Sequence, residues 1–197
     1  MNDARRQVAS RLYEGSREHD RGQANRLRRF RNVEPETAEL LGVLIRATRA
    51  RRILELGTSN GYSTIWLADA AEATGGKVIS VDIDAERTEL ARANLGDAGL
   101  ADRVELRTED AAATLAGSPE AAWEFVFLDA ERPAYSAYLR DLVRVLAPGG
   151  LLAIDNVRSH ADQLTEFTAL IEAEADLTQT VVPVGAGLRL ATREWPS

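Results

Sequence analysis

Cysteine is absent from this chain of 197 residues, and lysine occurs only once, as Lys77. Without cysteine there are no disulfide bonds, no thiolate ligands for a metal and no cysteine nucleophile. Long apolar runs are also missing, because none approaches the roughly 20 residues that a membrane-spanning helix needs. The first residues are not followed by the apolar stretch of a secretory signal. We therefore expect a cytoplasmic protein that has no membrane partner.

Each part of the chain is dominated by charge of one sign. The formal net charge is −7, but residues 1–31 contain nine arginines and only four acidic residues. The rest of the chain therefore has a net charge of −12, which repels nucleic-acid phosphates, so we expect no nucleic-acid partner. Three interpretations of the basic segment stay open: a solvated amphipathic helix, a contact with an acidic partner, or a contact with the acidic body of a second subunit.

From residue 50 onward, short apolar runs alternate with segments of helical spacing. Strands that alternate with helices of this length predict right-handed βαβ units and a mostly parallel sheet covered on both faces. We expect Pro148-Gly149-Gly150 to end the last of these helices and to turn into the next strand. The expected strands are Ile53–Leu56, Val78–Val81, Val104–Leu106, Phe125–Leu128 and Leu151–Ile154, and the expected helices are Tyr62–Ala73, Ala85–Leu95, Ala111–Leu115 and Tyr135–Leu146.

The two ends of the chain complete the expected fold. A helix at Ala161–Ala173 precedes Leu177–Val182 and Leu188–Thr192, and the short connection between these two strands predicts an antiparallel hairpin. Near the N-terminus, Glu34–Arg49 has Pro35 in its first turn and an apolar stripe typical of a helix. We predict one domain, residues 1–197, with an N-terminal helical segment at 1–49 and an α/β core at 50–197.

A carboxylate stands at the end of each expected parallel strand. In open α/β sheets, ligands bind beyond the carboxyl ends of the strands, so these acids are predicted to border a binding site. Helix capping accounts for some of them. An edge this rich in acceptors suits a cationic cofactor with ribose hydroxyls, a hard metal ion, or both. The acids are Glu55, Asp82, Asp84, Glu109, Asp110, Asp129 and Asp155.

The loop after the first expected strand contains Gly57 and Gly61 in the spacing G-x-x-x-G. Gly57 permits a sharp turn, and Gly61 permits close approach to a ligand where the next helix begins. The spacing lacks one glycine of the G-x-G-x-x-G pattern of dinucleotide-binding enzymes. The glycines alone are a weak signal, but Glu55 before them and Asp82 at the end of the next strand strengthen it, because Asp82 can accept hydrogen bonds from both ribose hydroxyls.

Four blocks of the sequence are characteristic of one protein family: Asn32-Val33-Glu34-Pro35, Leu54–Ser63, Phe127-Leu128-Asp129-Ala130 and Ile154-Asp155-Asn156-Val157. The last hairpin, Pro183-Val184-Gly185-Ala186-Gly187, adds a looser match. Through these blocks the chain resembles the class I S-adenosylmethionine-dependent methyltransferases. Among them it is similar to the cation-dependent O-methyltransferases that include the catechol and caffeoyl-CoA enzymes. The resemblance covers roughly residues 32–192.

This resemblance implies a Rossmann-like, doubly wound, mostly parallel seven-stranded sheet with an antiparallel C-terminal hairpin and extra N-terminal helices. It also implies a small phenolic substrate and assembly as a homodimer. The implied cofactor is S-adenosylmethionine, and the positions that match its pocket are Val33, Glu55, Gly57, Gly61, Ser63, Asp82, Ala111 and Asp129. The implied metal ligands are Asp129, Asp155 and Asn156, an oxygen-only set that suits Mg²⁺, or alternatively Mn²⁺ or Ca²⁺.

The chain departs from the family at the position of the general base. Relatives usually have a lysine three residues after the first metal-binding aspartate, and this chain has Arg132 there. Arginine stays protonated and cannot accept the phenolic proton, although it can hold an anionic oxygen or a substrate carboxylate. His160, four residues after Asn156, is the alternative candidate base, unless it only caps the next helix or lies in solvent. Deprotonation by the metal alone is the remaining possibility.

Three other functions stay open. In the first, a metal-independent methyltransferase uses Arg132 and Arg158 to bind an acidic substrate. A dinucleotide-binding oxidoreductase is the second, although the missing glycine argues against it. The third is an inactive homologue that retains the cofactor fold.

Overall fold

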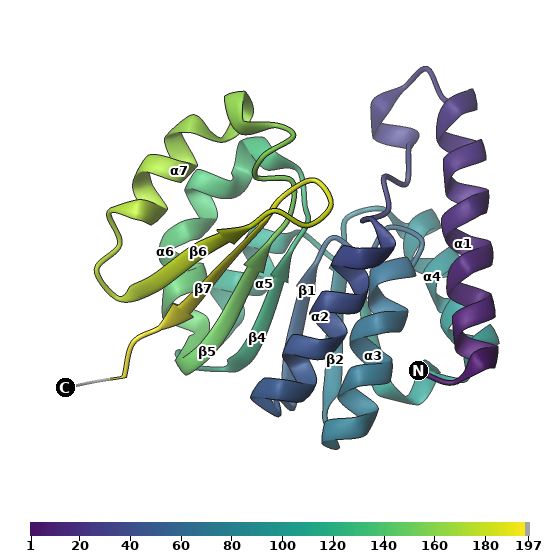
Figure 1. Ribbon diagram of the computed structural model, residues 1–197, viewed down its shortest axis with the longest axis horizontal. Helices are drawn as coiled ribbons and strands as arrows, with labels where there is room; N and C mark the ends of the chain where they lie inside the picture. The colour runs from purple at the N-terminus through teal and green to yellow at the C-terminus, as the bar shows by residue number, and fades with distance from the viewer. Residues whose placement is uncertain (196–197) are drawn as a thin grey trace.

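A seven-stranded mixed sheet forms the centre of the protein (Figure 1). The computed structural model describes residues 1–195, so the last two residues of the predicted domain lie outside the described residues. The strand order is β3-β2-β1-β4-β5-β7-β6, with β1 to β5 parallel and β7 antiparallel to both of its neighbours. The strands are β1 (Arg52–Leu56), β2 (Lys77–Asp82), β3 (Val104–Thr108), β4 (Trp123–Leu128), β5 (Leu146–Ile154), β6 (Leu177–Val182) and β7 (Leu188–Arg193). The predicted doubly wound sheet with its C-terminal hairpin is confirmed.

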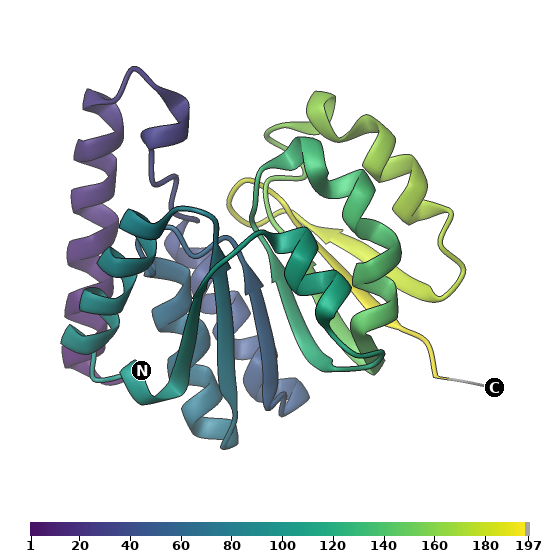
Figure 2. The same ribbon diagram turned by 180° about the vertical axis from the view of Figure 1, so that it is seen from behind.

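Helices cover both faces of this sheet. The helices α1 (Asp3–Gly22), α2 (Pro35–Thr48), α3 (Tyr62–Thr74) and α4 (Ala85–Asp97) share one apolar core. On the opposite face, α5 (Ala111–Gly117), α6 (Tyr135–Val145) and α7 (Thr165–Glu172) share the second (Figure 2). Four short 3₁₀ turns complete the chain: η1 (Arg26–Arg28), η2 (Ala101–Arg103), η3 (Arg132–Ala134) and η4 (Ala161–Leu164).

Side chains alternate between these two cores along each central strand. On β1, Ile53 belongs to the core of α1–α4, whereas Leu54 and Leu56 belong to the core of α5–α7. Phe125 and Val126 divide in the same way on β4. Strands buried on both faces read as continuous apolar runs, which is why their positions were predictable from the sequence. Within residues 1–195, no helix combines the length and the apolar character required to cross a membrane.

Two local predictions were wrong. Pro148-Gly149-Gly150 does not lie between α6 and a later strand, because β5 begins at Leu146 and includes these residues. The pairing of β4 with β5 is irregular here, since Trp123 pairs with Leu146 and Phe125 with Leu151. A bulge accommodates a proline that has no N–H to donate to the sheet. The predicted helix Ala161–Ala173 is divided into the 3₁₀ turn η4 and the shorter helix α7.

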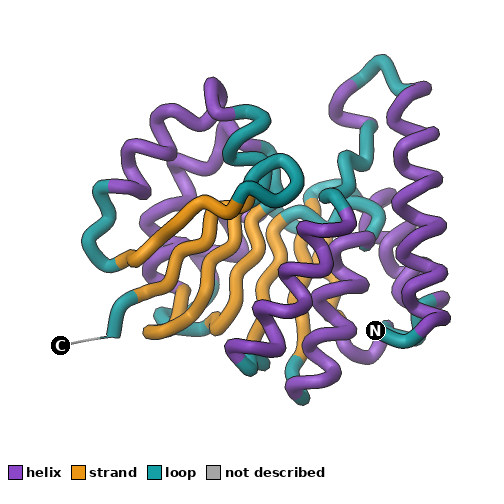
Figure 3. The backbone as a smooth tube through the Cα atoms, in the orientation of Figure 1, coloured by secondary structure: helices purple, strands orange, loops and turns teal. Residues whose placement is uncertain are grey.

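The basic N-terminal segment contacts the acidic body of its own chain, an arrangement that none of the three interpretations anticipated. Helix α1 stands beside the layer formed by α2 and α3 (Figure 3). Arg5 forms ion pairs with Asp69 and Glu72, at 2.9 and 2.6 Å, and Arg11 forms one with Asp97 at 2.7 Å. The opposite charges of the two parts of the chain therefore attract each other within one molecule.

Asp69 is the buried centre of this contact, and its carboxylate accepts hydrogen bonds from Arg5 at 2.9 Å and from Arg46 at 2.5 Å. Burial alone would raise the pKa of Asp69, but the hydrogen bonds from these two arginines outweigh it and hold the pKa below its ordinary value. The ionised carboxylate therefore stabilises the folded state at neutral pH, and this contribution is lost as the pH falls through the depressed pKa.

We predict that Asp69→Asn lowers the free energy of unfolding at pH 7 by about 3 kcal/mol, because it leaves two arginines without their buried partner. Urea denaturation followed by circular dichroism measures this loss. Glu72→Gln, which removes the half-exposed partner of Arg5, is the matched control and should cost less than about 1 kcal/mol. Equal losses of unfolding free energy in the two variants would show that the buried ion pair of Asp69 stabilises the protein no more than the half-exposed pair of Glu72.

Candidate functional site

A cleft of about 280 Å³ opens where the parallel strands end. Its walls are the loops that follow these strands, together with residues 30–33 of the N-terminal segment. Most residues predicted for the site line this cleft, but Glu55, Gly61, Asp155 and His160 do not. The predicted residues that line it are Val33, Gly57, Ser63, Asp82, Ala111, Asp129, Arg132 and Asn156.

The glycine loop joins the ends of three strands. The Gly57 N–H donates to the Val81 carbonyl of β2 at 2.9 Å, and the Asp129 N–H donates to the Leu56 carbonyl of β1 at 2.9 Å. Gly57 has φ of +110°, and a Cβ atom added there would collide with the Asp129 carbonyl oxygen. Only glycine allows the loop to pass so close to the end of β4. Gly61, at φ +84°, caps the start of α3 against Ala91.

Glu55 lies beneath this loop, where its side chain is fully buried. Its carboxylate accepts hydrogen bonds from Ser63 at 2.5 Å, Thr64 at 2.5 Å and Ser80 at 2.6 Å. Burial raises the pKa of Glu55 to about 7, although the three hydroxyl groups oppose the increase. Glu55 therefore acts on the cleft through Ser63, which it holds in place and which lines the cleft.

Asp82 ends β2 and lines the cleft. One carboxylate oxygen accepts from the Ser59 N–H at 2.8 Å, and the other accepts from the Asp84 N–H at 3.0 Å. These bonds fix the carboxylate, whose remaining lone pairs can accept from vicinal hydroxyl groups such as those of a ribose. Ile83 beside it also lines the cleft and is 74% exposed, so an apolar surface adjoins the acid.

Asp129 and Asp155 bring two carboxylates together where β4 and β5 end. Asn156 bridges them, since its amide nitrogen donates to Asp129 at 3.2 Å and to Asp155 at 2.8 Å. Burial raises the pKa of Asp155 to about 7. Burial and the neighbouring charge of Asp155 likewise raise the pKa of Asp129 well above its ordinary value. Asn156 has φ of +66°, a left-handed conformation that asparagine adopts more readily than most residues.

The donor set at this edge fits a hard cation. Asp155 Oδ1 is buried and has no hydrogen-bond partner within the described chain. An unsatisfied oxygen beside a second buried carboxylate, where burial raises the pKa of both groups and the charge of Asp155 raises that of Asp129 further, is an environment that a bound cation relieves. Residues 1–195 contain no cluster of three or more His, Cys, Asp or Glu side chains suited to a metal, so the Asn156 amide would have to supply the third protein ligand.

Arg132, at the position of the family's general base, and His160, the alternative candidate base, lie in different environments. Arg132 is 6% exposed and lines the cleft, and its Nε donates to Gln163 Oε1 at 3.0 Å. His160 lies outside the lining, and its Nδ1 is 2.8 Å from the Ser159 hydroxyl. Burial and the positive charges of Arg132 and Arg26 lower the pKa of His160, so its ring stays neutral near pH 7.

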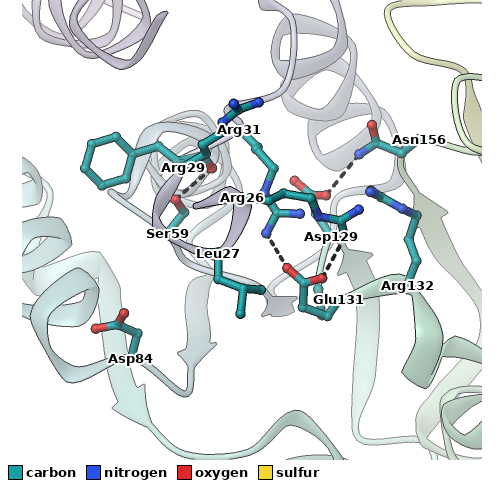
Figure 4. Close-up of polar contacts among 12 residues, drawn as sticks. Arg26, Leu27, Arg29, Arg31, Ser59, Asp84, Asp129, Glu131, Arg132 and Asn156 are labelled. Atoms are coloured by element: carbon teal, nitrogen blue, oxygen red, sulfur yellow. Dashed lines mark hydrogen bonds and ion pairs between the residues drawn. The ribbon is translucent and has the colours of Figure 1, made fainter. Parts of the chain in front are cut away.

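Apart from Val33, the N-terminal wall of the cleft at residues 30–33 was not predicted from the sequence, and neither were the contacts that anchor it through residues 26–31 (Figure 4). Arg26 and Arg31 both form ion pairs with Glu131, and Arg87 donates to the carbonyl oxygens of residues 27 and 29. The Ser59 hydroxyl donates to the carbonyl oxygen of residue 30 at 3.0 Å. These contacts join residues far apart in the chain, so no local pattern could reveal them; the only signal was the adjacent block at residues 32–35.

Comparison with known proteins points in one direction. The model of a family described as O-methyltransferase matches residues 17–194. A catechol O-methyltransferase from Mycobacterium tuberculosis is 39% identical over 128 residues, which are 64% of this chain but only 56% of that relative. An O-methyltransferase from Bacillus cereus, solved in complex with SAH, has a TM-score of 0.79 at 27% identity and covers 95% of this chain and 91% of its own. The O-methyltransferase TomG from Streptomyces achromogenes, in complex with SAM, has a TM-score of 0.79 at 27% identity over 99% and 91% of the two chains.

The raised pKa of Glu55 predicts a specific pH dependence. In the unfolded chain this carboxyl ionises near its ordinary pKa of 4.5, but in the folded protein it ionises only near 7. The folded state therefore loses up to roughly 3 kcal/mol of relative stability as the pH rises from 4.5 through 7. Glu55→Gln, which cannot ionise, should abolish this part of the dependence.

Urea denaturation at several pH values between 4.5 and 8 measures the effect as the difference between the variant and the wild type. Other titrating groups are common to both proteins and cancel in that difference. Glu89→Gln, at an exposed position on α4, should leave the wild-type pH dependence unchanged. Parallel curves for Glu55→Gln and the wild type would contradict the assigned pKa.

Proposed function

This chain belongs to the O-methyltransferase family, and on that premise we propose that it is an S-adenosylmethionine-dependent O-methyltransferase. We propose further that it depends on a divalent metal and methylates a hydroxyl of a small catechol-like or other phenolic acceptor. One observation carries the proposal: a cleft lined by the glycine loop and Asp82 adjoins the paired carboxylates of Asp129 and Asp155. A site for a ribose-bearing cation and a site for a hard dication thus lie side by side.

The cofactor half of the proposal rests on the acids and on the glycine loop. S-adenosylmethionine supplies a methyl group on a positively charged sulfur, and its transfer forms an oxygen–carbon bond while the electron pair of the sulfur–carbon bond stays on sulfur. Asp82 would accept hydrogen bonds from the ribose hydroxyls, and the backbone at Gly57 would leave room for the ligand. Val33, Ser63, Ala111 and Asp129 supply the remaining walls, while Glu55 and Gly61 hold the loop from behind. Two solved relatives are in complex with SAH and with SAM, which supports this cofactor.

The metal half rests on the unsatisfied oxygen of Asp155. Asp129, Asp155 and Asn156 would hold Mg²⁺, or alternatively Mn²⁺ or Ca²⁺, and the ion would polarise two adjacent phenolic oxygens and ease the loss of a proton. The protein orients the acceptor beside the methyl donor, which can contribute roughly 7–11 kcal/mol to lowering the barrier. Relatives named catechol O-methyltransferase and caffeoyl-CoA O-methyltransferase support a phenolic acceptor.

The proposal also includes assembly as a homodimer and a cytoplasmic location, both of which rest on resemblance and on composition. Light scattering coupled to size-exclusion chromatography tests the dimer directly. A mass of about 43 kDa, twice the 21.5 kDa of one chain, supports it, and a monomeric mass overturns it.

We predict that the purified protein transfers a methyl group from S-adenosylmethionine to a catechol in the presence of Mg²⁺, and that EDTA lowers the rate at least about 100-fold.

Asp155→Asn should lower kcat/KM by about 100-fold or more while SAH affinity, measured by isothermal titration, changes less than about threefold. Asp82→Asn should instead weaken SAH binding about 10-fold or more, because the neutral amide replaces a charged acceptor of the ribose hydroxyls.

Each alternative has its own outcome in these assays. Full activity in EDTA would establish the metal-independent methyltransferase. Binding of NAD in place of SAH would establish the oxidoreductase, and SAH binding without turnover on any catechol or hydroxycinnamoyl acceptor would establish the inactive homologue. Thermal denaturation serves as a folding control, since removing one of two mutually repelling carboxylates should not destabilise Asp155→Asn.

A further inference from the structure

Arg132 carries a buried positive charge for which the protein provides no counter-charge within hydrogen-bond distance. Three arginines line the cleft, and two of them are paired: Arg31 with Glu131 and Arg87 with Asp84. Arg132 forms no ion pair with any residue that the structure describes, although it is the most buried of the three. Burial of an unpaired guanidinium is costly, and a bound anion would offset that cost.

The free end of this side chain opens into the cleft. Nε is satisfied by Gln163 Oε1 at 3.0 Å, which fixes the plane of the guanidinium. Neither Nη atom donates to a residue in the described chain, and neither is sealed from solvent, so both face the space that Arg132 lines. Figure 4 shows the side chain reaching toward Asp129 and Asn156, the corner where the proposed metal and acceptor lie. Two adjacent N–H groups in a fixed plane are suited to an anionic oxygen.

The charges around Arg132 leave room for one anion. Asp129 and Asp155 together would balance a bound dication, and Glu131 is already taken by Arg26 and Arg31. His160 lies outside the cleft lining, and because its pKa is lowered it stays neutral near pH 7 and adds no charge. With the dication bound, the positive charge of Arg132 would therefore remain unbalanced, and a singly ionised acceptor would neutralise it. The titratable and charged groups around Arg132 and the two carboxylates are Asp129, Asp155, His160, Glu131, Tyr135, Arg26, Arg31, Glu34 and Glu55.

We propose that Arg132 binds the reacting oxygen of the acceptor as an anion and does not act as the base. This assignment rests on the proposed function and specifies how the same site handles its substrate. The phenolic proton passes to water, and the oxygen then uses its electron pair to form the bond to the methyl group. Because no side chain at this position can take the proton, the enzyme selects acceptors by their acidity.

A nitrocatechol tests this assignment without turnover, because its phenolate absorbs at longer wavelength than its neutral form. The probe is titrated with the SAH complex of the protein across a pH series, once with Mg²⁺ and once with EDTA. In EDTA, we expect the probe bound to the wild type to ionise at least about one pH unit below the probe bound to Arg132→Met. A guanidinium in contact favours the anion, whereas the carboxylates of Asp129 and Asp155, which disfavour it, are present in both proteins. Mg²⁺ should add a further decrease.

Arg132→Lys, which keeps a positive charge, should retain part of this difference from Arg132→Met. Arg140→Met is the matched control, because Arg140 lies exposed on the neighbouring helix α6 and should leave the ionisation of the bound probe unchanged. The groups around Arg132 are the same in every variant, so their influence cancels in the comparison.

Equal ionisation of the bound probe in the wild type and in Arg132→Met would overturn the role of Arg132 and leave the proposed function intact. Failure of the wild type to bind any catechol, with or without Mg²⁺, would overturn the acceptor class itself and the assignment with it. The two failures are therefore distinguishable.

Kinetics provide a second readout that a purely structural residue would not change. In the wild type, kcat/KM should rise steeply along a series of increasingly acidic catechols. Arg132→Lys introduces a group that carries a positive charge when protonated but that, unlike arginine, can lose its proton and in that neutral form accept the proton of the acceptor. The dependence on acceptor acidity should therefore become shallower, and the least acidic acceptor should gain relative to the others. Identical dependence in the two proteins would contradict the proposal.

Discussion

The organisation of this site depends on the repulsion between two carboxylates. Asp129 and Asp155 follow neighbouring parallel strands, so the sheet itself holds them together and neither can move away. Their pKa values are raised by burial, and that of Asp129 also by the charge of Asp155. Two features of the surrounding residues accompany this electrostatic constraint. Asn156 adopts a left-handed backbone conformation and its amide bridges the two carboxylates. Arg132 is buried nearby and forms no ion pair with a described residue.

The rest of the architecture keeps that constraint in place while leaving space beside it. The turn at Gly57 passes against the end of β4, so the glycine loop and the carboxylate corner form one continuous wall. Glu55 supports the loop from below through three hydroxyl groups. On the other side, Arg26 and Arg31 fasten the N-terminal wall to Glu131, next to Arg132. The excess of positive charge in residues 1–31 thus helps to enclose the cleft.

The sequence predicted the sheet and the position of the site because both depend on short-range patterns. Apolar runs with alternating helices define the strands, and parallel strands necessarily bring their carboxyl ends to one edge. The burial of Glu55 beneath the glycine loop, outside the cleft lining, was not predictable in the same way. Its hydroxyl partners come from α3 and β2, and only the register of the assembled sheet brings Ser63 and Ser80 to one carboxylate.

Other details depend on long-range packing in a similar manner. The docking of α1 on its own chain is decided by complementary charges that are more than 60 residues apart, as for Arg5 and Asp69. The bulge at Pro148 depends on how β5 pairs with β4. His160 was expected at the metal edge, but the turn after Asn156 places it outside the cleft lining and against Ser159. In each case the residue type indicated a role, but partners elsewhere in the fold determined where the residue or segment lies.

The central claim is that the corner formed by Asp129, Asp155 and Asn156 holds a dication beside an S-adenosyl ligand. A crystal of the protein grown with SAH and Mn²⁺, with diffraction recorded where manganese scatters anomalously, addresses it directly. The account predicts an anomalous peak within about 2.4 Å of oxygens from all three residues, with SAH in the adjoining cleft and the Arg132 guanidinium facing the open side of the ion. SAH bound in the cleft with no anomalous density at that corner would contradict the account.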